Sequence, residues 1–278
     1  MQPVTILYFG AGKVSQWIDL FTLLGYYIND VAPLGVNTNT GGTKMYRIAE
    51  FNMDFKDMGG YLKKLCAPFE CESGIADIEI TVTPKDLERE KELAENPHSR
   101  EYLESVAANR LLAEILPQKD AFLLHSAVFE VGGEGVAFAA RSGTGKTTHL
   151  LRWQALLGDK LTVINGDKPF VRFFEGSEYP FAYGTPWKGK ENLGNTGKTP
   201  LKHICFIERG GENKAEELKK DEAADLLFSQ VYMPKNPQSA AKTLELLEKL
   251  LNTCKLWKIT CNLDNDAAKN PYKTIFER

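Results

Sequence analysis

Short apolar runs, separated by glycine-containing turns, dominate the second half of the chain. They predict buried strands, and they lie at residues 122–129, 136–140, 161–164, 201–208 and 256–262. Stretches with apolar side chains at helical spacing predict helices, and they lie at residues 149–157, 214–232, 239–253 and 267–276. Because strands alternate with helices here, the pattern predicts an α/β fold for this half.

The first half has another pattern, in which short strands precede two helices. We expect strands at residues 4–9, 44–51 and 75–82, turns at residues 10–13 and 37–42, and a helix over residues 99–116. Thr83 is a suitable N-cap for an earlier helix, with Pro84 in its first turn and Asp86 placed to complete a capping box. We therefore expect a smaller α+β N-terminal lobe of unknown role over residues 1–118 and a second domain over residues 119–278.

Composition and charge narrow the class of protein. The chain has 278 residues, of which 43% are hydrophobic, enough for one large core or two smaller ones. Its formal net charge of -3 gives no basic field, so we expect no nucleic-acid partner. Without a membrane-spanning apolar run or a signal-peptide pattern, we expect a cytoplasmic protein with no membrane partner. A homo-oligomer stays open.

The five cysteines are an odd number and lack the paired spacing of a zinc site. Cys66 and Cys71 could hold a metal only with partners from elsewhere in the chain. We expect reduced thiols, with Cys205 and Cys261 inside strands.

The apolar run at residues 136–140 ends in a stretch that is typical of a phosphate-binding loop. Backbone N–H groups and the positive end of a helix converge in such a loop, where nucleotide phosphates bind. We expect the nucleotide to be bound by Ser142, Gly143, Thr144, Gly145, Lys146, Thr147 and Thr148. Ala140 stands where the usual pattern has the first Gly, so the loop is a variant.

An acid follows the next buried strand, at Asp167. Mg²⁺ on nucleotide phosphates needs a carboxylate, so we expect Thr147 and Asp167 to hold Mg²⁺ while Lys146 reaches the β- and γ-phosphates of ATP. His125 lies on the strand predicted at residues 122–129 and is a candidate for proton transfer, since a neutral imidazole accepts a proton near pH 7. A histidine that only bonds a phosphate or a backbone carbonyl is the alternative.

A further segment has the composition of a mobile substrate loop. Gly184-Thr185-Pro186-Trp187-Lys188-Gly189-Lys190 has no helix or strand periodicity. We expect Lys188 or Lys190 to approach the γ-phosphate and Trp187 to exclude water, with a surface loop around a buried Trp as the alternative. Arg209 ends the strand at residues 201–208 and is a candidate for phosphate or acceptor contact, with a salt bridge as the other possibility.

His125, the loop and Asp167 occur in an order that resembles the HPr kinase/phosphorylase family and its relatives with a phosphoenolpyruvate carboxykinase-type core. The resemblance covers about residues 122–276 and is closest to an HPr-kinase-related branch of bacterial proteins, on the segments at residues 124–128, 165–169, 184–190 and 206–210. It implies a P-loop-containing core, ATP and Mg²⁺ as cofactors, and phosphoryl transfer to a hydroxyl acceptor. The resemblance does not identify the acceptor, and we expect either a serine of a small protein or peptide, or a small molecule.

The chain departs from this family at one position. The family's kinases end the strand before Asp167 with two adjacent acids, a base and a metal neighbour, whereas this chain has Gly166-Asp167. Either His125 accepts the proton or Asp167 serves both purposes. Two other functions stay open: a nucleotide-binding regulatory protein that has lost catalysis, and a carboxykinase-like enzyme. The length of the chain and the lack of an obvious His/Lys metal set disfavour the carboxykinase.

Overall fold

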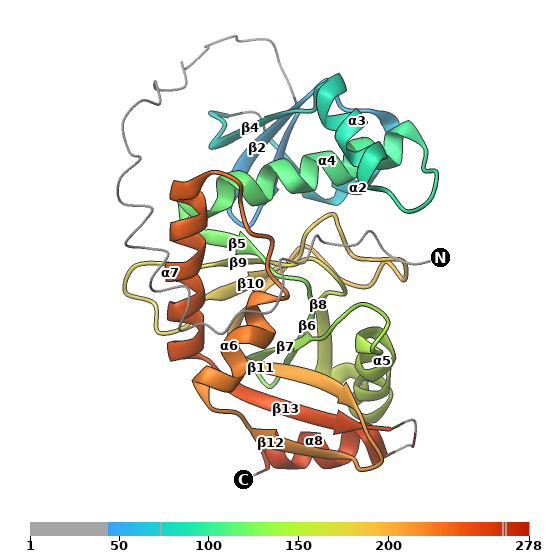
Figure 1. Cartoon of the computed structure of the whole chain (residues 1–278), viewed down its shortest axis with the longest axis vertical. Helices are drawn as coiled ribbons and strands as arrows, with labels where there is room; N and C mark the ends of the chain where they lie inside the picture. Colours follow the sequence, from blue (N-terminus) through green and yellow to red (C-terminus); the bar gives the residue numbers. More distant parts are fainter. Residues whose placement is uncertain (1–43, 73, 263, 265, 278) are drawn as a thin grey trace.

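The computed structural model describes residues 44–72, 74–262, 264 and 266–277, which form a mixed α/β structure. A small lobe, at the top of Figure 1, precedes a larger part built around a long sheet. The predicted strand at residues 4–9 and the turns at residues 10–13 and 37–42 lie outside the described residues. No helix in the described part is long and apolar enough to cross a membrane.

The small lobe consists of a four-stranded sheet with helices packed against it. Its strands lie in the order β3-β1-β2-β4, and they are β1 (Met45–Ile48), β2 (Phe51–Lys56), β3 (Glu70–Cys71) and β4 (Ile78–Thr81). Its helices are α2 (Gly60–Cys66), η1 (Ala67–Phe69), α3 (Pro84–Leu93), α4 (Arg100–Ile115) and η2 (Leu116–Lys119). Met53 of β2, Ile80 of β4 and Leu112 of α4 share one apolar core.

Both helices predicted in this lobe are confirmed, together with the N-cap predicted for the first of them. The Thr83 hydroxyl accepts a hydrogen bond from the backbone N–H of Asp86 at 3.3 Å, and the Asp86 carboxylate accepts one from the N–H of Thr83 at 3.0 Å. Ser99 caps α4 by accepting from the N–H of Tyr102 at 3.2 Å. These side chains satisfy N–H groups that the first turn of a helix leaves without partners.

The larger part has a sheet that divides at its longest strand, β11. One arm runs β5-β9-β10-β11, and the other places β7, β6 and β8 on one side of β11 and β13 and β12 on the other. The strands are β5 (Ala121–Leu123), β6 (Ser126–Val131), β7 (Glu134–Ala139), β8 (Leu161–Asn165), β9 (Phe170–Arg172), β10 (Phe181–Tyr183), β11 (Lys198–Arg209), β12 (Lys214–Glu217) and β13 (Lys255–Cys261).

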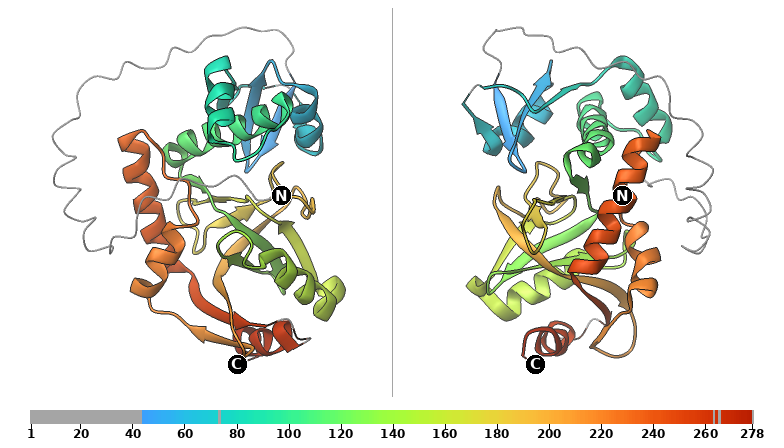
Figure 2. Two further views of the ribbon diagram at one scale, coloured as in Figure 1. Left: turned by 45° about the vertical axis from the view of Figure 1, so that its right-hand side comes forward. Right: turned by 90° about the vertical axis from the view of Figure 1, so that its left-hand side faces the viewer.

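Helices cover both faces of this sheet (Figures 1 and 2). They are α5 (Lys146–Leu157), η3 (Gly158–Lys160), α6 (Lys220–Phe228), α7 (Pro237–Thr253) and α8 (Asp266–Phe276). Successive side chains of a strand point to opposite faces. Phe138 of β7 accordingly packs in one core with Trp153 of α5, and Ala137 packs in the other with Leu227 of α6 and Leu250 of α7. The α/β prediction for this half is confirmed at the level of the fold class.

Two predicted elements are wrong because distant segments decide their structure. The strand expected at residues 122–129 is two strands, broken where the N–H of Leu124 donates to the carbonyl of Pro169 and the N–H of His125 donates to that of Gln230. The helix expected at residues 214–232 starts with β12, which pairs with β13, and only then continues as α6. Cys205 and Cys261 lie in β11 and β13, as predicted, and all five cysteines are unpaired.

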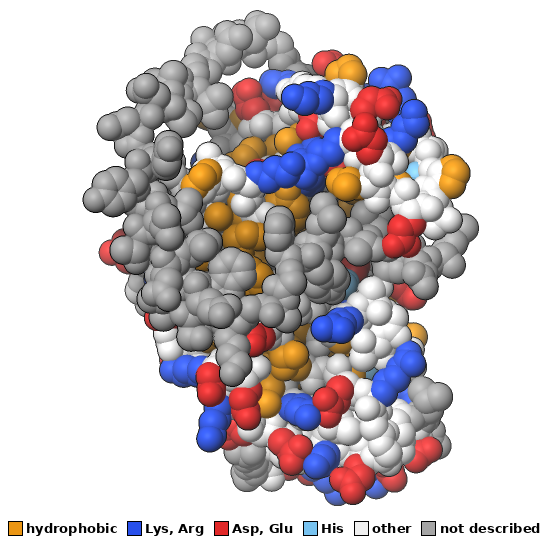
Figure 3. Space-filling view, in the orientation of Figure 1, with side chains coloured by type: hydrophobic (Ala, Val, Ile, Leu, Met, Phe, Trp, Pro, Cys, Tyr) orange, Lys and Arg blue, Asp and Glu red, His pale blue; other side chains and the backbone are white. Residues whose placement is uncertain are grey.

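The small lobe and the sheet share one continuous core. Tyr183 and Trp187 pack in the same cluster as Leu112 of α4. The turn between β1 and β2 also docks on the sheet, because Arg172 donates to the carbonyl of Ala49 at 2.7 Å and Tyr183 donates to Glu50 at 2.9 Å. The boundary predicted between residues 118 and 119 stays a prediction. On the face in Figure 3, basic and acidic side chains are interspersed over the described surface.

Candidate functional site

The loop between β7 and α5 places an uncapped helix end beside open space. Gly145 is the N-cap residue of α5 and has no side chain to occupy the first N–H groups of the helix. Gly143 and Gly145 have φ values of 78° and 118°, a conformation that L side chains rarely adopt, and a Cβ atom at either position would meet no atom within 4 Å. The loop therefore has the shape and the space to fit a phosphate group.

Lys146, the first residue of α5, lies with its amine buried under this loop. Its side chain is 8% exposed, and its Nζ donates to the carbonyl of Ala140 at 2.9 Å. The same Nζ lies 3.1 Å from Nε2 of His125. Because an ammonium group can only donate, this contact requires the lone pair of a neutral imidazole on Nε2 while Lys146 is protonated.

Asp167 is held in place by the turn that follows β8. The side-chain oxygen of Asn165 accepts from the N–H groups of Asp167 and Lys168, at 2.9 and 2.8 Å, and the carbonyl of Asp167 accepts from the N–H of Ser126 at 3.0 Å. Its carboxylate lies 3.4 Å from Nε2 of His125 and 3.4 Å from Nζ of Lys168. The structure thus brings together the three residues predicted to be catalytic.

The charges of this cluster follow from burial and from each other. Burial alone would raise the pKa of Asp167, but Lys168, His125 and Lys146 outweigh it and hold that pKa well below its usual range. Burial lowers the pKa of Lys146 to about 8 although Asp167 opposes the shift. Burial, together with the charges of Lys146 and Lys168, lowers the pKa of His125 more than Asp167 raises it. Near neutral pH the site therefore holds a carboxylate, a neutral imidazole and an ammonium that is easy to deprotonate.

The other residues predicted to bind the nucleotide lie in the loop or in the first turn of α5, and their roles stay predictions. Thr147 is half-buried on the first turn of α5, next to Lys146, and hydroxyl and carboxylate oxygens are the ligands that a hard cation such as Mg²⁺ prefers. Ser142 and Thr148 are exposed. Arg209 reaches the loop from β11, where its guanidinium donates to the carbonyls of Gly143 and Thr144.

The loop predicted to be mobile, residues 184–190, belongs to a longer segment, residues 184–197, that is bonded to the sheet. The N–H of Gly184 donates to the carbonyl of Gly197 at 2.9 Å, and the N–H of Asn195 donates to that of Ile164 at 3.1 Å. Thr185 also donates to the carbonyl of Lys168 at 2.8 Å. Through these bonds the segment packs against the end of β8 and against the turn that carries Asp167.

Trp187 is buried in the core, whereas we expected it to cover the phosphates and exclude water from them. It is 8% exposed, and its indole N–H lies 3.0 Å from both the carbonyl and the hydroxyl oxygen of Ser105 on α4. The alternative of a buried Trp is the one that the structure shows. Lys188 is half-buried, with its Nζ 3.3 Å from the carbonyl of Gly194, and Lys190 is exposed.

The same segment explains why Gly166 stands beside Asp167. A Cβ atom at position 166 would lie 3.0 Å from the carbonyl oxygen of Lys188 and 3.2 Å from the Cβ of Leu193. Both distances are tighter than ordinary contacts. A side chain at this position would therefore require Lys188 or Leu193 to shift by a few tenths of an ångström.

Two residues of the site were missed as functional candidates. Asn165 fixes the turn that presents Asp167, and Lys168 pairs with its carboxylate. The sequence Asn165-Gly166-Asp167-Lys168 contained the signal, because Asn favours a turn in which its side chain bonds the backbone two residues later.

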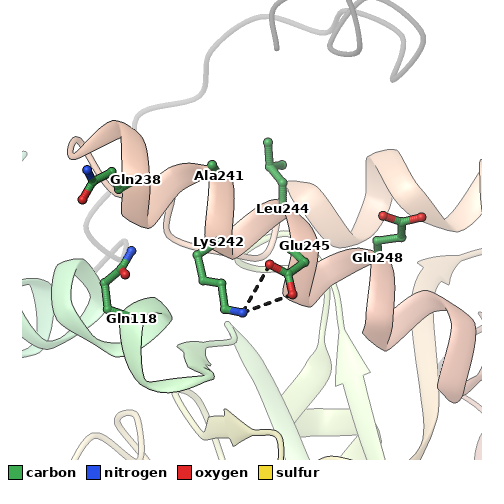
Figure 4. Close-up of a pocket in the computed structure, with 7 residues that line it drawn as sticks. All are labelled: Gln118, Gln238, Ala241, Lys242, Leu244, Glu245 and Glu248. Atoms are coloured by element: carbon green, nitrogen blue, oxygen red, sulfur yellow. Dashed lines mark hydrogen bonds and ion pairs between the residues drawn. The ribbon is translucent and has the colours of Figure 1, made fainter. Parts of the chain in front are cut away.

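A separate surface hollow lies between η2 and α7 (Figure 4). Its cationic side chain, Lys242, is already paired, because Glu245 and Asp120 each lie 3.1 Å from its Nζ.

Comparisons with known proteins add little to this geometry. No protein-family model matches the chain, and no curated protein matches it. A solved structure, the Hpr(Ser) kinase/phosphatase from Coxiella burnetii, is similar with a TM-score of 0.24 and 9% sequence identity, over 47% of this chain and 88% of that chain. A likeness at this level carries no argument about function, so the residues of the site must carry it.

Proposed function

We propose that the protein is an ATP- and Mg²⁺-dependent kinase that transfers the γ-phosphoryl group to a hydroxyl acceptor. The observation that carries the proposal is the meeting of Lys146, His125 and Asp167 at the base of a glycine loop that opens a helix. A buried cation, a neutral imidazole and a stabilised carboxylate supply the groups that phosphoryl transfer uses for charge neutralisation, proton transfer and metal binding.

In this proposal the loop and Lys146 hold the nucleotide. The N–H groups at the start of α5 would bind phosphate oxygens, and the ammonium of Lys146 would turn from Ala140 and His125 toward the β- and γ-phosphates. Thr147 and Asp167 would hold Mg²⁺, which neutralises charge on the phosphates. Because Asp167 stays ionised over the whole physiological range, it suits this role.

The proton of the acceptor hydroxyl needs a separate base. A carboxylate with a strongly lowered pKa is a weak proton acceptor, whereas His125 is neutral near pH 7 and faces Asp167 through Nε2. That nitrogen becomes available when Lys146 moves to the phosphates. His125 is therefore the base in this proposal, and Asp167, 3.4 Å from Nε2, would hold the metal and stabilise the imidazolium that forms when His125 takes up the proton.

The test measures nucleotide binding and phosphoryl transfer separately. Titration with ATP and Mg²⁺ should show binding by the wild type and a loss of at least about 100-fold for Lys146→Ala, since a buried charge-assisted contact is removed. With labelled ATP and serine-containing peptides as probes, Asp167→Asn and His125→Gln should each lower transfer by about 100-fold or more. Undiminished transfer by Asp167→Asn would refute the assigned chemistry.

A nucleotide-binding regulatory protein is the second candidate, and the packing around Gly166 favours it. The chain has Gly166 in the tightly packed position before Asp167, so the turn after β8 supplies one carboxylate, whose pKa is well below its usual range. If ATP binds with Mg²⁺ but neither the peptide probes nor water accept the phosphoryl group, this second function replaces the first. The matched variant is again Lys146→Ala, which should abolish binding under either function.

A further inference from the structure

Arg209 reaches the glycine loop because β11 is longer than its neighbour β7. The two strands run parallel, with Phe206 beside Ala139. β7 leaves the sheet after Ala139, whereas β11 continues to Arg209. The end of the longer strand therefore lies level with the loop that follows the shorter one.

The guanidinium of Arg209 binds two consecutive carbonyl groups of the loop. Its Nε donates to the oxygen of Thr144 at 3.2 Å, and its Nη2 donates to the oxygen of Gly143 at 2.6 Å. A planar fork with fixed donor directions makes such a paired contact, and the single ammonium of a lysine does not reproduce it.

Holding these carbonyls also orients the N–H groups on the other side of the same peptide planes. In a trans peptide the C=O and the N–H point in opposite directions, so the plane of Thr144 and Gly145 directs the N–H of Gly145 away from Arg209. The N–H of Thr144 closes a turn onto the carbonyl of Arg141 at 3.1 Å. One side chain thus fixes two successive planes of the loop.

The contact with Arg209 is important because few other contacts hold the loop in one conformation. Gly143 and Gly145 have open space around them, and residues 141–143 are exposed. Glycine loses more conformational freedom than other residues when it is ordered, and that loss would otherwise oppose ligand binding. A loop that is ordered beforehand binds more tightly because this entropy is no longer lost on binding.

We propose that Arg209 is a positioning residue, which orders the loop through the carbonyls of Gly143 and Thr144 and does not itself contact phosphate. The two bonds to the loop use two of the five guanidinium N–H donors, so the comparison of ADP with ATP below tests whether the other donors contact phosphate. The consequence for phosphate binding rests on the proposed function. The ordering of the loop is a property of the protein without nucleotide and can be tested alone.

The first experiment measures hydrogen exchange of the protein without nucleotide. Arg209→Gln should speed exchange of the Thr144 amide, which donates to the carbonyl of Arg141, by about tenfold, because both carbonyl contacts that hold this turn are lost. Arg152→Gln is the matched control, since Arg152 also donates to a backbone carbonyl, that of Asp264, but away from the loop. Equal loop exchange in Arg209→Gln and wild type would overturn the proposal, and the Tm of each variant distinguishes local loosening from unfolding.

The second experiment compares ADP with ATP, each with Mg²⁺. A positioning role predicts that Arg209→Gln weakens both by the same factor, about tenfold, that Arg209→Lys recovers only part of it, and that transfer at saturating ATP stays within about twofold of wild type. A loss confined to ATP would show direct contact with the γ-phosphate and overturn the proposal. Wild type that binds neither nucleotide would refute the proposed function, whereas the exchange experiment would still decide whether Arg209 orders the loop.

Discussion

Two glycine-containing segments border Asp167 and Lys146, and their glycines serve different physical purposes. In the loop before α5, a Cβ atom at Gly143 would meet nothing within 4 Å, and the glycine is needed for its φ of 78°. In the segment at residues 184–197, a Cβ atom at Gly184 would lie 1.9 Å from the carbonyl oxygen of Asn195. The first segment uses glycine for conformation alone, whereas the second uses it for close approach, which at Gly189 and Gly194 is combined with a positive φ.

This difference separates a segment that can bind a ligand from one that supports the site. Space around the first loop is open to a phosphate, and its backbone is held mainly from one side, by Arg209. The second segment packs against β8 and against Asp167 itself, since a Cβ atom at Gly189 would lie 3.0 Å from the Cβ of Asp167. We therefore expect changes in the first segment to affect binding and changes in the second to affect stability.

Gly184→Ala should give the largest effect. The added methyl group clashes with backbone atoms, so the segment must shift, and we expect the free energy of unfolding to fall by about 3 kcal/mol. Urea denaturation measures the loss. Gly211→Ala is the control, because a Cβ atom there would meet nothing within 4 Å, and it should stay within about 0.5 kcal/mol of wild type. Equal stability of the two variants would contradict the close packing of the second segment.

Gly143→Ala should affect binding more than stability. Alanine in a left-handed conformation costs about 1 kcal/mol, and the loop can relieve this strain by moving away from the shape that holds phosphate. We expect ATP affinity to fall by about tenfold in an equilibrium titration. Gly133→Ala is matched to it, since Gly133 has the same φ of 78° and equally open space in the β6–β7 turn. If both variants lose the same affinity, the loop has no special role.

The sequence predicted those features of the site that depend on the local pattern of residues. The strand before the loop, the helix after it and the acid after β8 follow from apolar runs and turn residues, and the structure brings Lys146, His125 and Asp167 together. What failed depends on partners far along the chain. Leu124 and His125 leave the strand to bond residues 169 and 230, and local pattern contains no information about them.

The two segments could not be distinguished from composition, because both are rich in glycine and cations. Whether a glycine allows a positive φ or a close contact is decided by the three-dimensional neighbours, as for Gly184 and Asn195. The contact of Arg209 with the loop depends on the register of two parallel strands, which the sequence does not reveal. Trp187 likewise could be a lid or a core residue until its bond to Ser105 was known.

Nucleotide affinity should fall as the pH rises through about 8, because Lys146 loses its proton in the unliganded protein. Phosphate oxygens favour the ammonium, so binding raises the pKa again, and affinity at pH 9 should be about tenfold lower than at pH 7. The same lowered pKa makes this group's contribution to stability rise with pH between about 8 and 10.5. Lys146→Arg keeps its charge and should give a flat profile, and a fall of equal size in that variant would assign the effect to another group.

Trp187→Phe should give the smallest effect and bears directly on the second segment. Phenylalanine keeps most of the packing but loses the indole N–H, which leaves the buried carbonyl of Ser105 without this donor. We expect the free energy of unfolding to fall by about 1 kcal/mol, measured by urea denaturation, with ATP affinity unchanged. A residue that closed over the phosphates to exclude water would behave in the opposite way, since its loss would lower phosphoryl transfer and leave stability unchanged. Ser105→Ala removes the hydroxyl on the other side of the contact and keeps the carbonyl, so it should cost less than Trp187→Phe if the indole mainly joins the segment to α4.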